Sequence, residues 1–270
     1  PHHIKLFDSQ RYSYRDLPIR LAEFGTVYRW EQSGEISGMT RVRGFTQDDA
    51  HIFCRPDQVE AEVNRVLDLT FHLLHSFGLD EYEIMLSTRP DKAVGEPEQW
   101  GLATDSLRRT LEGRGMAYDV DEGGGAFYGP KIDFHIRDCM GRSWQCGTIQ
   151  LDFNMPVRFG ASYTGSDNQP HTPVMIHRAI LGSLERFIGI LVEHFAGKFP
   201  LWLAPVQAQL LPVSDKFLDY ANVVAAQFRA AGIRAKVDDR NETLGKKLRD
   251  AQLAHVNYQL VVGEREEQSQ

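Results

Sequence analysis

The sequence predicts an α+β fold of 270 residues, in which an antiparallel sheet covered by helices is followed by a small α/β domain. Strand-like segments occur in pairs typical of hairpins, which favour an antiparallel rather than a doubly wound sheet. Segments with apolar residues at a helical period lie between these pairs. Beyond residue 203 strands and helices alternate singly, as in an α/β domain.

In the first part, strands are expected at 26–31, 44–54, 83–87, 132–137, 143–153 and 174–177. Helices are expected at 17–25, 57–77, 98–112 and 178–195. The helix at 57–77 has the clearest apolar period and ends at Gly78. Two hairpins follow from these ranges, one with a long Gly/Ser-rich connection at 32–40 and one turning at Met140-Gly141.

The segment Phe199–Pro205, with two prolines, marks the predicted domain boundary. The domains are therefore expected at 1–203 and 204–270. In the second domain we predict strands at 207–212, 235–238 and 259–262, with helices at 215–231 and 244–254, in the order βαβαβ.

Composition indicates a globular protein, 42% hydrophobic, with a net charge of -7. There is no apolar run long enough for a membrane span and no signal-peptide pattern, so a cytoplasmic protein with three reduced cysteines is expected. Residues from 204 onward have balanced charges and repel RNA less than the acidic first part. Lys246, Lys247 and Arg249 are candidate phosphate contacts there, with an ordinary solvated surface as the open alternative.

Arg29-Trp30-Glu31 and the segment 41–51 form the first group of candidate functional residues. Because side chains alternate along a strand, one face of 43–51 presents a cation, an aromatic ring, an amide, a carboxylate and an imidazole. These are Arg43, Phe45, Gln47, Asp49 and His51. A solvated sheet face is the alternative interpretation, although such a face more often presents Thr, Lys and Glu.

Three further groups contain chemically useful side chains. A glycine-rich stretch at 123–125 precedes Tyr128 and Lys131, which can reach over a ligand, although a tight surface turn fits equally. The segment 145–152 has polar residues on both faces, and Cys146 within it is expected to be packed rather than nucleophilic. On the predicted helix 178–195, Gly182 and Arg186 would share one stripe.

Arg29-Trp30-Glu31 resembles motif 2 of class II aminoacyl-tRNA synthetases, and Gly182–Phe187 resembles their motif 3. Segments 41–51, 126–131 and 174–183 resemble threonyl-tRNA synthetase of the bacterial type. The resemblance implies a threonine–tRNA ligase with a class II sheet and, at 204–270, part of an anticodon-binding domain. It also implies ATP, L-threonine and tRNA(Thr) as partners, and a homodimer.

The resemblance implies that Arg29 contacts the α-phosphate and the threonine carboxylate, Arg41 contacts the distal phosphates, and Arg186 stacks on adenine opposite Phe45. Magnesium would accompany ATP, so that catalysis consists of charge neutralisation and positioning. The implied ATP-binding set is Arg29, Glu31, Arg41, Phe45, Gln145, Thr148 and Arg186. The implied catalytic set is Arg29, Arg186 and Lys131.

The resemblance further implies a zinc ion held by His51, His177 and a cysteine of a Cys-Pro-x-His element. This chain begins at the Pro1 of that element, so the cysteine is expected one residue earlier. Threonine binding is implied for Gln47, Asp49 and Tyr128, and contact with the tRNA 3′ end for Gln150. Cys54 is expected to be structural, because three residues along a strand place it on the face opposite His51.

Two alternatives remain at this stage. A catalytically silent paralogue that binds RNA as a regulator would tolerate loss of the cysteine, although retention of the phosphate-binding arginines argues against it. Another class II synthetase, such as the prolyl or seryl enzyme, would not need His51 and His177 together with Asp49.

Overall fold

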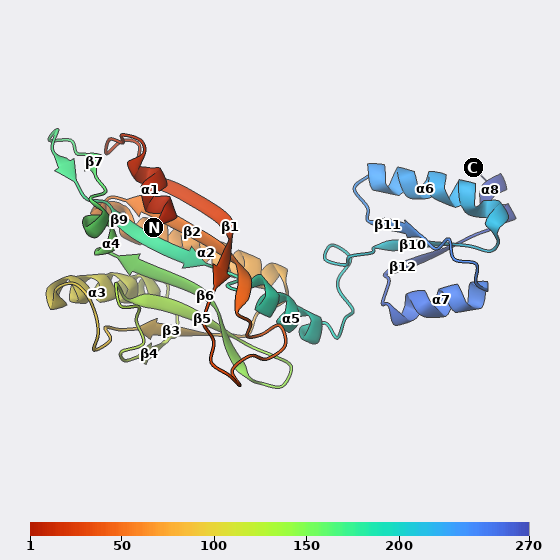
Figure 1. Cartoon of the computed structure of the whole chain (residues 1–270), viewed down its shortest axis with the longest axis horizontal. Helices are drawn as coiled ribbons and strands as arrows, with labels where there is room; N and C mark the ends of the chain where they lie inside the picture. Colours follow the sequence, from red (N-terminus) through yellow and green to blue (C-terminus); the bar gives the residue numbers. More distant parts are fainter. Residues whose placement is uncertain (270) are drawn as a thin grey trace. The chain divides into compact units, whose positions relative to one another are not determined.

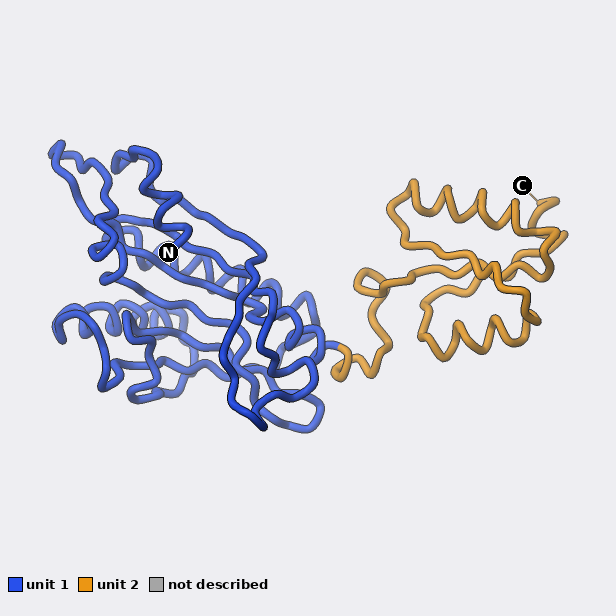
Figure 2. The backbone as a smooth tube through the Cα atoms, viewed as in Figure 1, with its two compact units in different colours: residues 1–191 blue, residues 192–270 orange. Residues whose placement is uncertain are grey.

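The computed structural model describes residues 1–269 and contains two compact units, Pro1–Leu191 and Val192–Gln270 (Figure 2). Each unit is described by itself below. None of the helices among the described residues is long and apolar enough to cross a membrane.

The first unit is built on a seven-stranded sheet in the order β1-β2-β9-β6-β5-β3-β4 (Figure 1). Its strands are β1 (Ile19–Tyr28), β2 (Gly44–Cys54), β3 (Tyr82–Ser87), β4 (Asp119–Asp121), β5 (Lys131–Arg137), β6 (Ser143–Asp152) and β9 (Val174–Ala179). All neighbouring pairs are antiparallel except β3 and β4. The predicted antiparallel sheet with flanking helices is therefore confirmed.

Helices α2 (Val59–Ser76) and α3 (Pro97–Gly113) pack on each other and on one face of this sheet. A short 3₁₀ turn (Pro56–Gln58) leads into α2. The main core of the unit lies between these helices and the inward side chains of the strands, such as Ile52, Ile132, Ile149 and Ile176. Burying this apolar surface is the main stabilising contribution of the fold.

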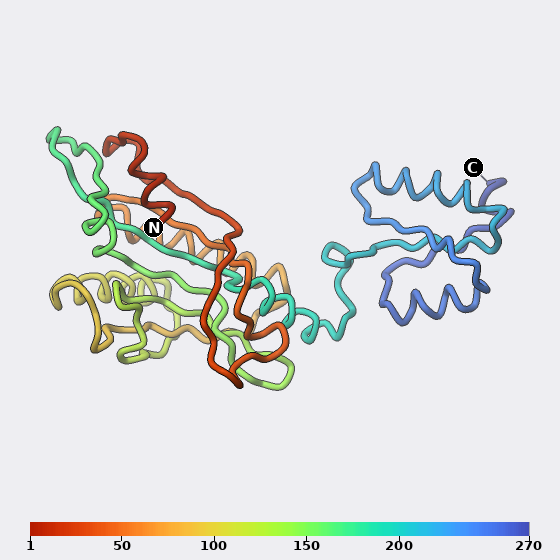
Figure 3. The backbone as a smooth tube through the Cα atoms, viewed as in Figure 1, coloured from red at the N-terminus to blue at the C-terminus, as the bar shows by residue number. Residues whose placement is uncertain are grey.

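The remaining elements are short. They are α1 (His2–Asp8), α4 (Met155–Phe159), β7 (Tyr163–Thr164), β8 (Pro170–His171) and α5 (Leu184–His194). Figure 3 shows the orange strand β2 running beside the teal strand β9, so that distant parts of the sequence meet in the sheet.

The predicted helix at 17–25 is wrong, because this segment is part of strand β1. Its residues pair with β2 over ten positions, from Ile19 opposite Phe53 to Tyr28 opposite Gly44. The predicted helix at 178–195 is wrong in its first part. Residues 178–179 complete β9, and α5 begins only at Leu184.

In the second unit three parallel strands are ordered β11-β10-β12, with β10 (Ala208–Pro212) in the middle between β11 (Ala235–Val237) and β12 (Tyr258–Val262). Helices α6 (Leu218–Ala230) and α7 (Leu244–Leu253) lie on opposite faces of this sheet (Figure 1), and α8 (Glu264–Gln268) follows β12. A 3₁₀ turn at Asp215–Phe217 precedes α6. The predicted small α/β domain is confirmed.

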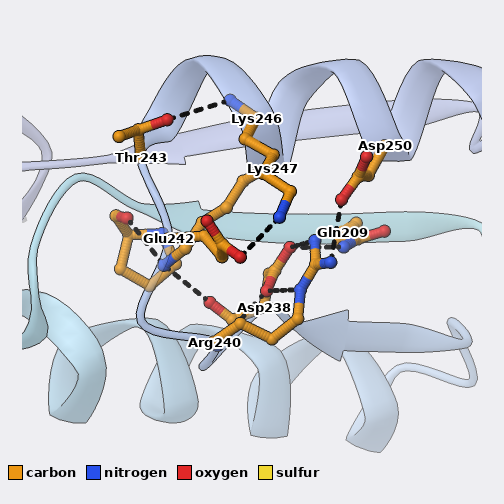
Figure 4. Close-up of polar contacts among 9 residues, drawn as sticks. Gln209, Asp238, Arg240, Glu242, Thr243, Lys246, Lys247 and Asp250 are labelled. Carbon is orange, nitrogen blue, oxygen red and sulfur yellow. Dashed lines mark hydrogen bonds and ion pairs between the residues drawn. The ribbon is translucent and has the colours of Figure 1, made fainter.

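The structure contradicts the interpretation of Lys247 as a phosphate contact. This residue of α7 is only 3% exposed, and its ammonium group donates to the backbone oxygens of Asp238 (3.1 Å) and Pro212 (3.5 Å) (Figure 4). The side chain of Arg240 pairs with Asp238 and Asp250 in the same cluster. Lys247 therefore ties the carboxyl ends of two strands together, while Lys246 at the surface pairs with Glu242.

Candidate active site

A row of polar side chains crosses the sheet on the face opposite α2 and α3. In the strand register His51 faces His177, His177 faces Gln150, and Gln150 faces Lys131. Directly opposed residues of antiparallel strands have Cβ atoms about 4.5–5.5 Å apart. The fold thus places four predicted site residues, which are up to 126 positions apart in sequence, in one line.

A cavity of about 400 Å³ opens over this face. Among the residues lining it are thirteen of the predicted site residues: Arg29, Glu31, Arg41, Phe45, Gln47, Asp49, Tyr128, Lys131, Gln145, Thr148, Gln150, His177 and Arg186. His51 lines an adjacent cavity of about 390 Å³, which shares Asp49, Tyr128 and His177 with the first. The structure therefore brings all the predicted site residues together.

Arginines gather at one end of the cavity. Arg29 lies over the ring of Phe45, with its guanidinium carbon 5.0 Å from the ring centre, and Arg41 pairs with Glu31 at 3.3 Å. Arg186 donates to the backbone oxygens of Thr40 (2.7 Å) and Gln145 (2.8 Å). Burial and the nearby positive charges of Arg41 and Arg29 lower the pKa of Arg186. Such a concentration of positive charge favours an anionic ligand.

Asp133 organises the floor of the cavity and was given no role in the sequence analysis. Its buried carboxylate accepts from the Gln145 amide (2.6 Å) and the Thr148 hydroxyl (2.9 Å), and pairs with Lys131 at 2.6 Å. The signal for it was the alternation Lys131-x-Asp133, which puts both side chains on one strand face. The Gln145 amide and the Thr148 hydroxyl both use a donor on Asp133. Each can therefore present an acceptor oxygen to a ligand.

A second buried carboxylate, Asp48, holds the segment after β9 against β2. It accepts from the backbone amides of Ile180 (2.8 Å), Leu181 (3.1 Å) and Gly182 (2.9 Å). Glu185, at the start of α5, accepts from the amide of Thr46 on β2 (2.9 Å). These contacts fix the position from which Arg186 reaches the cavity.

Gly182 lies before α5 with a φ of 72°, so it does not share a helical stripe with Arg186. A Cβ atom at this position would lie 2.4 Å from the backbone oxygen of Cys146. Both the left-handed backbone and the close approach require glycine here.

The imidazoles of His51 and His177 lie edge to face, with ring centres 4.6 Å apart. Burial, followed by the neighbouring His177 and His3, lowers the pKa of His51 to about 2, so its ring is neutral. His3, which the sequence analysis did not single out, places Nδ1 2.6 Å from Nδ1 of His51. His3, Asp49 and His51 can together present ligand atoms within 4.8 Å of one another. Imidazole nitrogens are donors that zinc prefers, so the group formed by His3, Asp49 and His51 suits a metal, and the ring of His177 lies beside it.

Neither buried cysteine belongs to this donor group. Cys54 packs in the core beneath α2, and burial raises its pKa to about 12. Burial likewise raises the pKa of Cys146 to about 12. Both are therefore protonated, packed thiols at neutral pH, as the sequence analysis expected.

Comparison with known proteins supplies the family. Residues 1–195 match the tRNA synthetase class II core domain (G, H, P, S and T), and residues 207–270 match an anticodon binding domain. The RNA binding domain of threonyl-tRNA synthetase from Cryptosporidium parvum Iowa II is 44% identical, with a TM-score of 0.94. The aligned region covers 100% of this chain and 68% of that one. The chain belongs to the threonyl-tRNA synthetase family.

Curated relatives agree with this assignment. Threonine--tRNA ligases of Sulfurihydrogenibium sp. and Thermus thermophilus are each 55% identical over 98% of this chain. The chain spans about two fifths of the length of these relatives, 41% in both cases. A prolyl-tRNA synthetase structure from Cryptosporidium parvum, with 19% identity and a TM-score of 0.66, shares the fold.

Proposed function

We propose that the protein containing this chain is a threonine–tRNA ligase, which activates L-threonine with ATP and transfers it to the 3′ end of tRNA(Thr). The observation that supports this most is the pairing of His51 with His177 beside Asp49, in a cavity that adjoins the arginine-lined one and shares Asp49 and His177 with it. An amino-acid pocket thereby adjoins an anion pocket, which is what adenylate formation requires.

In this proposal the reaction depends on charge and position. Attack of the threonine carboxylate on the α-phosphorus of ATP brings two anions together, and Arg29 and Arg41 neutralise them. ATP would arrive with magnesium, which bridges phosphate oxygens. Arg186 stacks on adenine opposite Phe45, and Gln145 and Thr148 accept from groups of the nucleotide. Lys131, which pairs with Asp133, adds an ammonium group at the cavity floor.

At the amino-acid end, His51 and His177 would hold a zinc ion, with a cysteine before Pro1 as the third ligand. With three protein ligands, zinc retains an open coordination position for the amino and hydroxyl groups of threonine. Asp49 accepts from the threonine hydroxyl, and Gln47 and Tyr128 contact the rest of the amino acid. Tyr128 donates to Gln150, which we assign to the ribose at the tRNA 3′ end.

We also propose a homodimer. Edge strand β1 presents Phe24 and Tyr28, and Trp30 follows it, with exposed fractions between 73% and 88%. Large apolar side chains exposed together are typical of a protein interface. Sedimentation equilibrium would test this, because a strictly monomeric protein at micromolar concentration contradicts it.

The function is tested by ATP–pyrophosphate exchange with threonine, valine and serine. Threonine should support exchange. Exchange with valine should be slower by about 10⁴-fold or more, because valine lacks the hydroxyl. Serine retains the hydroxyl and should be rejected poorly. Binding of tRNA without any exchange would instead support the silent RNA-binding alternative.

The metal is tested by adding a cysteine before Pro1. The chain extended by this cysteine should bind one zinc per protomer, and the 270-residue chain should bind zinc more weakly. His51→Ala and His177→Ala should each reduce threonine activation more than ATP binding. A zinc-free protein that activates threonine and rejects valine would remove the metal from the proposal.

A further inference from the structure

Asp152, the last residue of β6, is fully buried beneath the histidine pair and uses both of its carboxylate oxygens. Oδ1 accepts from the backbone amides of Asn154 and Met155, each at 2.8 Å, where the chain turns into α4. Oδ2 lies 2.9 Å from Nε2 of His177. A buried carboxylate thus links a turn of the backbone to one imidazole of the proposed metal site.

These contacts determine where the proton of a neutral His177 lies. An amide N–H can only donate, so Oδ1 is an acceptor twice, and a deprotonated Asp152 leaves Oδ2 as an acceptor as well. Nε2 of His177 must then carry the proton that occupies this hydrogen bond. In a neutral imidazole the other nitrogen, Nδ1, keeps its lone pair, and no described residue hydrogen-bonds to it.

The ring of His177 is also held on both sides. Its centre lies 4.9 Å from that of Tyr128 and 4.6 Å from that of His51. The hydrogen bond to Asp152 fixes the rotation of the ring between these neighbours, and therefore the direction of Nδ1. Nδ1 is the nitrogen left to bind a ligand.

We infer that Asp152 is a positioning residue, which selects the Nε2–H form of His177 and makes Nδ1 the metal-binding nitrogen. This rests on the proposed function only in that the ligand of Nδ1 is zinc. Ligating histidines commonly donate their second N–H to a carboxylate, and loss of that partner typically lowers metal affinity by about 10–100-fold.

Asp152→Asn is a discriminating change because it preserves size and hydrogen-bond number. The asparagine has one acceptor oxygen, and the backbone amides of residues 154 and 155 continue to donate to it. Its NH₂ group then faces Nε2 of His177, which must become an acceptor and give up its proton. The proton moves to Nδ1, and the nitrogen needed by the metal is blocked.

The first measurement is the tautomer itself, by long-range ¹H–¹⁵N NMR of metal-free protein labelled at histidine, at a pH where His177 is neutral. Wild type should show the Nε2–H form, and Asp152→Asn the Nδ1–H form. Nδ1–H in wild type overturns the inference without any variant, so a variant that fails to fold does not leave it undecided.

The second measurement is the affinity for Zn²⁺ alone, by competition with a chromogenic chelator. Asp152→Asn should weaken zinc binding by about 10–100-fold. Asp138→Asn is the matched control, because Asp138 is also buried and accepts from two backbone amides, those of Met140 and Arg142, far from the histidines. It should bind zinc as wild type does.

A double-mutant cycle separates positioning from general damage to the fold. In a His177→Ala background, Asp152→Asn should have no further effect on zinc affinity, because the imidazole through which it acts is gone. An equal loss in both backgrounds, or unchanged affinity in a folded Asp152→Asn protein, overturns the inference. If wild type binds no zinc, the proposal of a zinc site is wrong. The tautomer measurement still tests whether Asp152 selects the Nε2–H form of His177.

Discussion

Asp48 and Asp49 are neighbours on β2 for which we expect different roles. Replacing each by alanine should distinguish a stabilising role of Asp48 from a role of Asp49 in threonine recognition. Asp48 is 8% exposed and accepts from three backbone amides, of which those of Ile180 and Gly182 are buried. Asp49 lines the cavity, and among the described residues no backbone amide donates a hydrogen bond to its carboxylate.

The magnitude follows from the amides that Asp48→Ala leaves without an acceptor. Each buried donor left unsatisfied costs about 1–3 kcal/mol, so two cost about 2–6 kcal/mol. With a urea dependence of about 3 kcal/mol per molar for a unit of this size, the unfolding midpoint should fall by roughly 0.7–2 M. Asp49→Ala should shift it by less than about 0.2 M, since a partly exposed side chain without such partners contributes little.

The assay is urea unfolding followed by circular dichroism, combined with threonine-dependent exchange on the same preparations. Asp49→Ala should lose threonine activation while retaining stability, and Asp48→Ala should lose both. Equal midpoints for the two variants would refute the assignment of Asp48 to the segment at 180–182. Full activity in Asp49→Ala would refute its role in recognition.

Three further outcomes are expected. Arg29→Ala should reduce exchange at least 100-fold with an unchanged circular dichroism spectrum, because the proposed role of Arg29 is to neutralise charge at the reacting phosphate. Exchange within threefold of wild type contradicts this. Burial would raise the pKa of Asp138, but hydrogen bonds from Trp144 and from backbone amides outweigh it and lower the pKa from 3.8 to about 2. The stability difference between wild type and Asp138→Asn should therefore be full above pH 4 and disappear toward pH 2 in acid titrations of unfolding. Lys247→Ala should destabilise the second unit, whereas Lys246→Ala should leave its unfolding midpoint unchanged and lower the salt slope of tRNA binding by about one if it touches phosphate.

How much of the fold the sequence predicts depends on how local the deciding contacts are. The helix at Val59–Ser76 was predicted within two residues, because its apolar period and the glycine after it are local signals. The segment 17–25 resembles a helix by the same criterion, with Leu17 and Leu21 four residues apart. Residues 19–25 become part of a strand because they pair with β2, and such tertiary pairing overrides local preference.

The site shows the same division. Alternation along β2 correctly grouped Phe45, Gln47, Asp49 and His51, and the motif segments located nearly all the cavity-lining side chains. The residues that hold them, Asp48, Asp133 and Asp152, were not predicted to do so. Asp133 is bound by side chains, and its alternation with Lys131 was the one local signal. Backbone amides are partners of Asp48 and Asp152, and such partners leave no residue-type pattern in the sequence. Those of Asp48 also lie more than 130 positions away.

The pairing of β2 with β9 has a consequence for how the chain acquires its site. These strands are separated by about 120 residues, so bringing them together costs loop-closure entropy, and such topologies fold slowly. During synthesis, β1 and β2 can form their hairpin early, but the inner edge of β2 remains unpaired until residues 174–179 leave the ribosome. An unpaired edge is a template for association with other chains. The nascent protein is therefore most vulnerable to aggregation over the stretch of translation between these two strands.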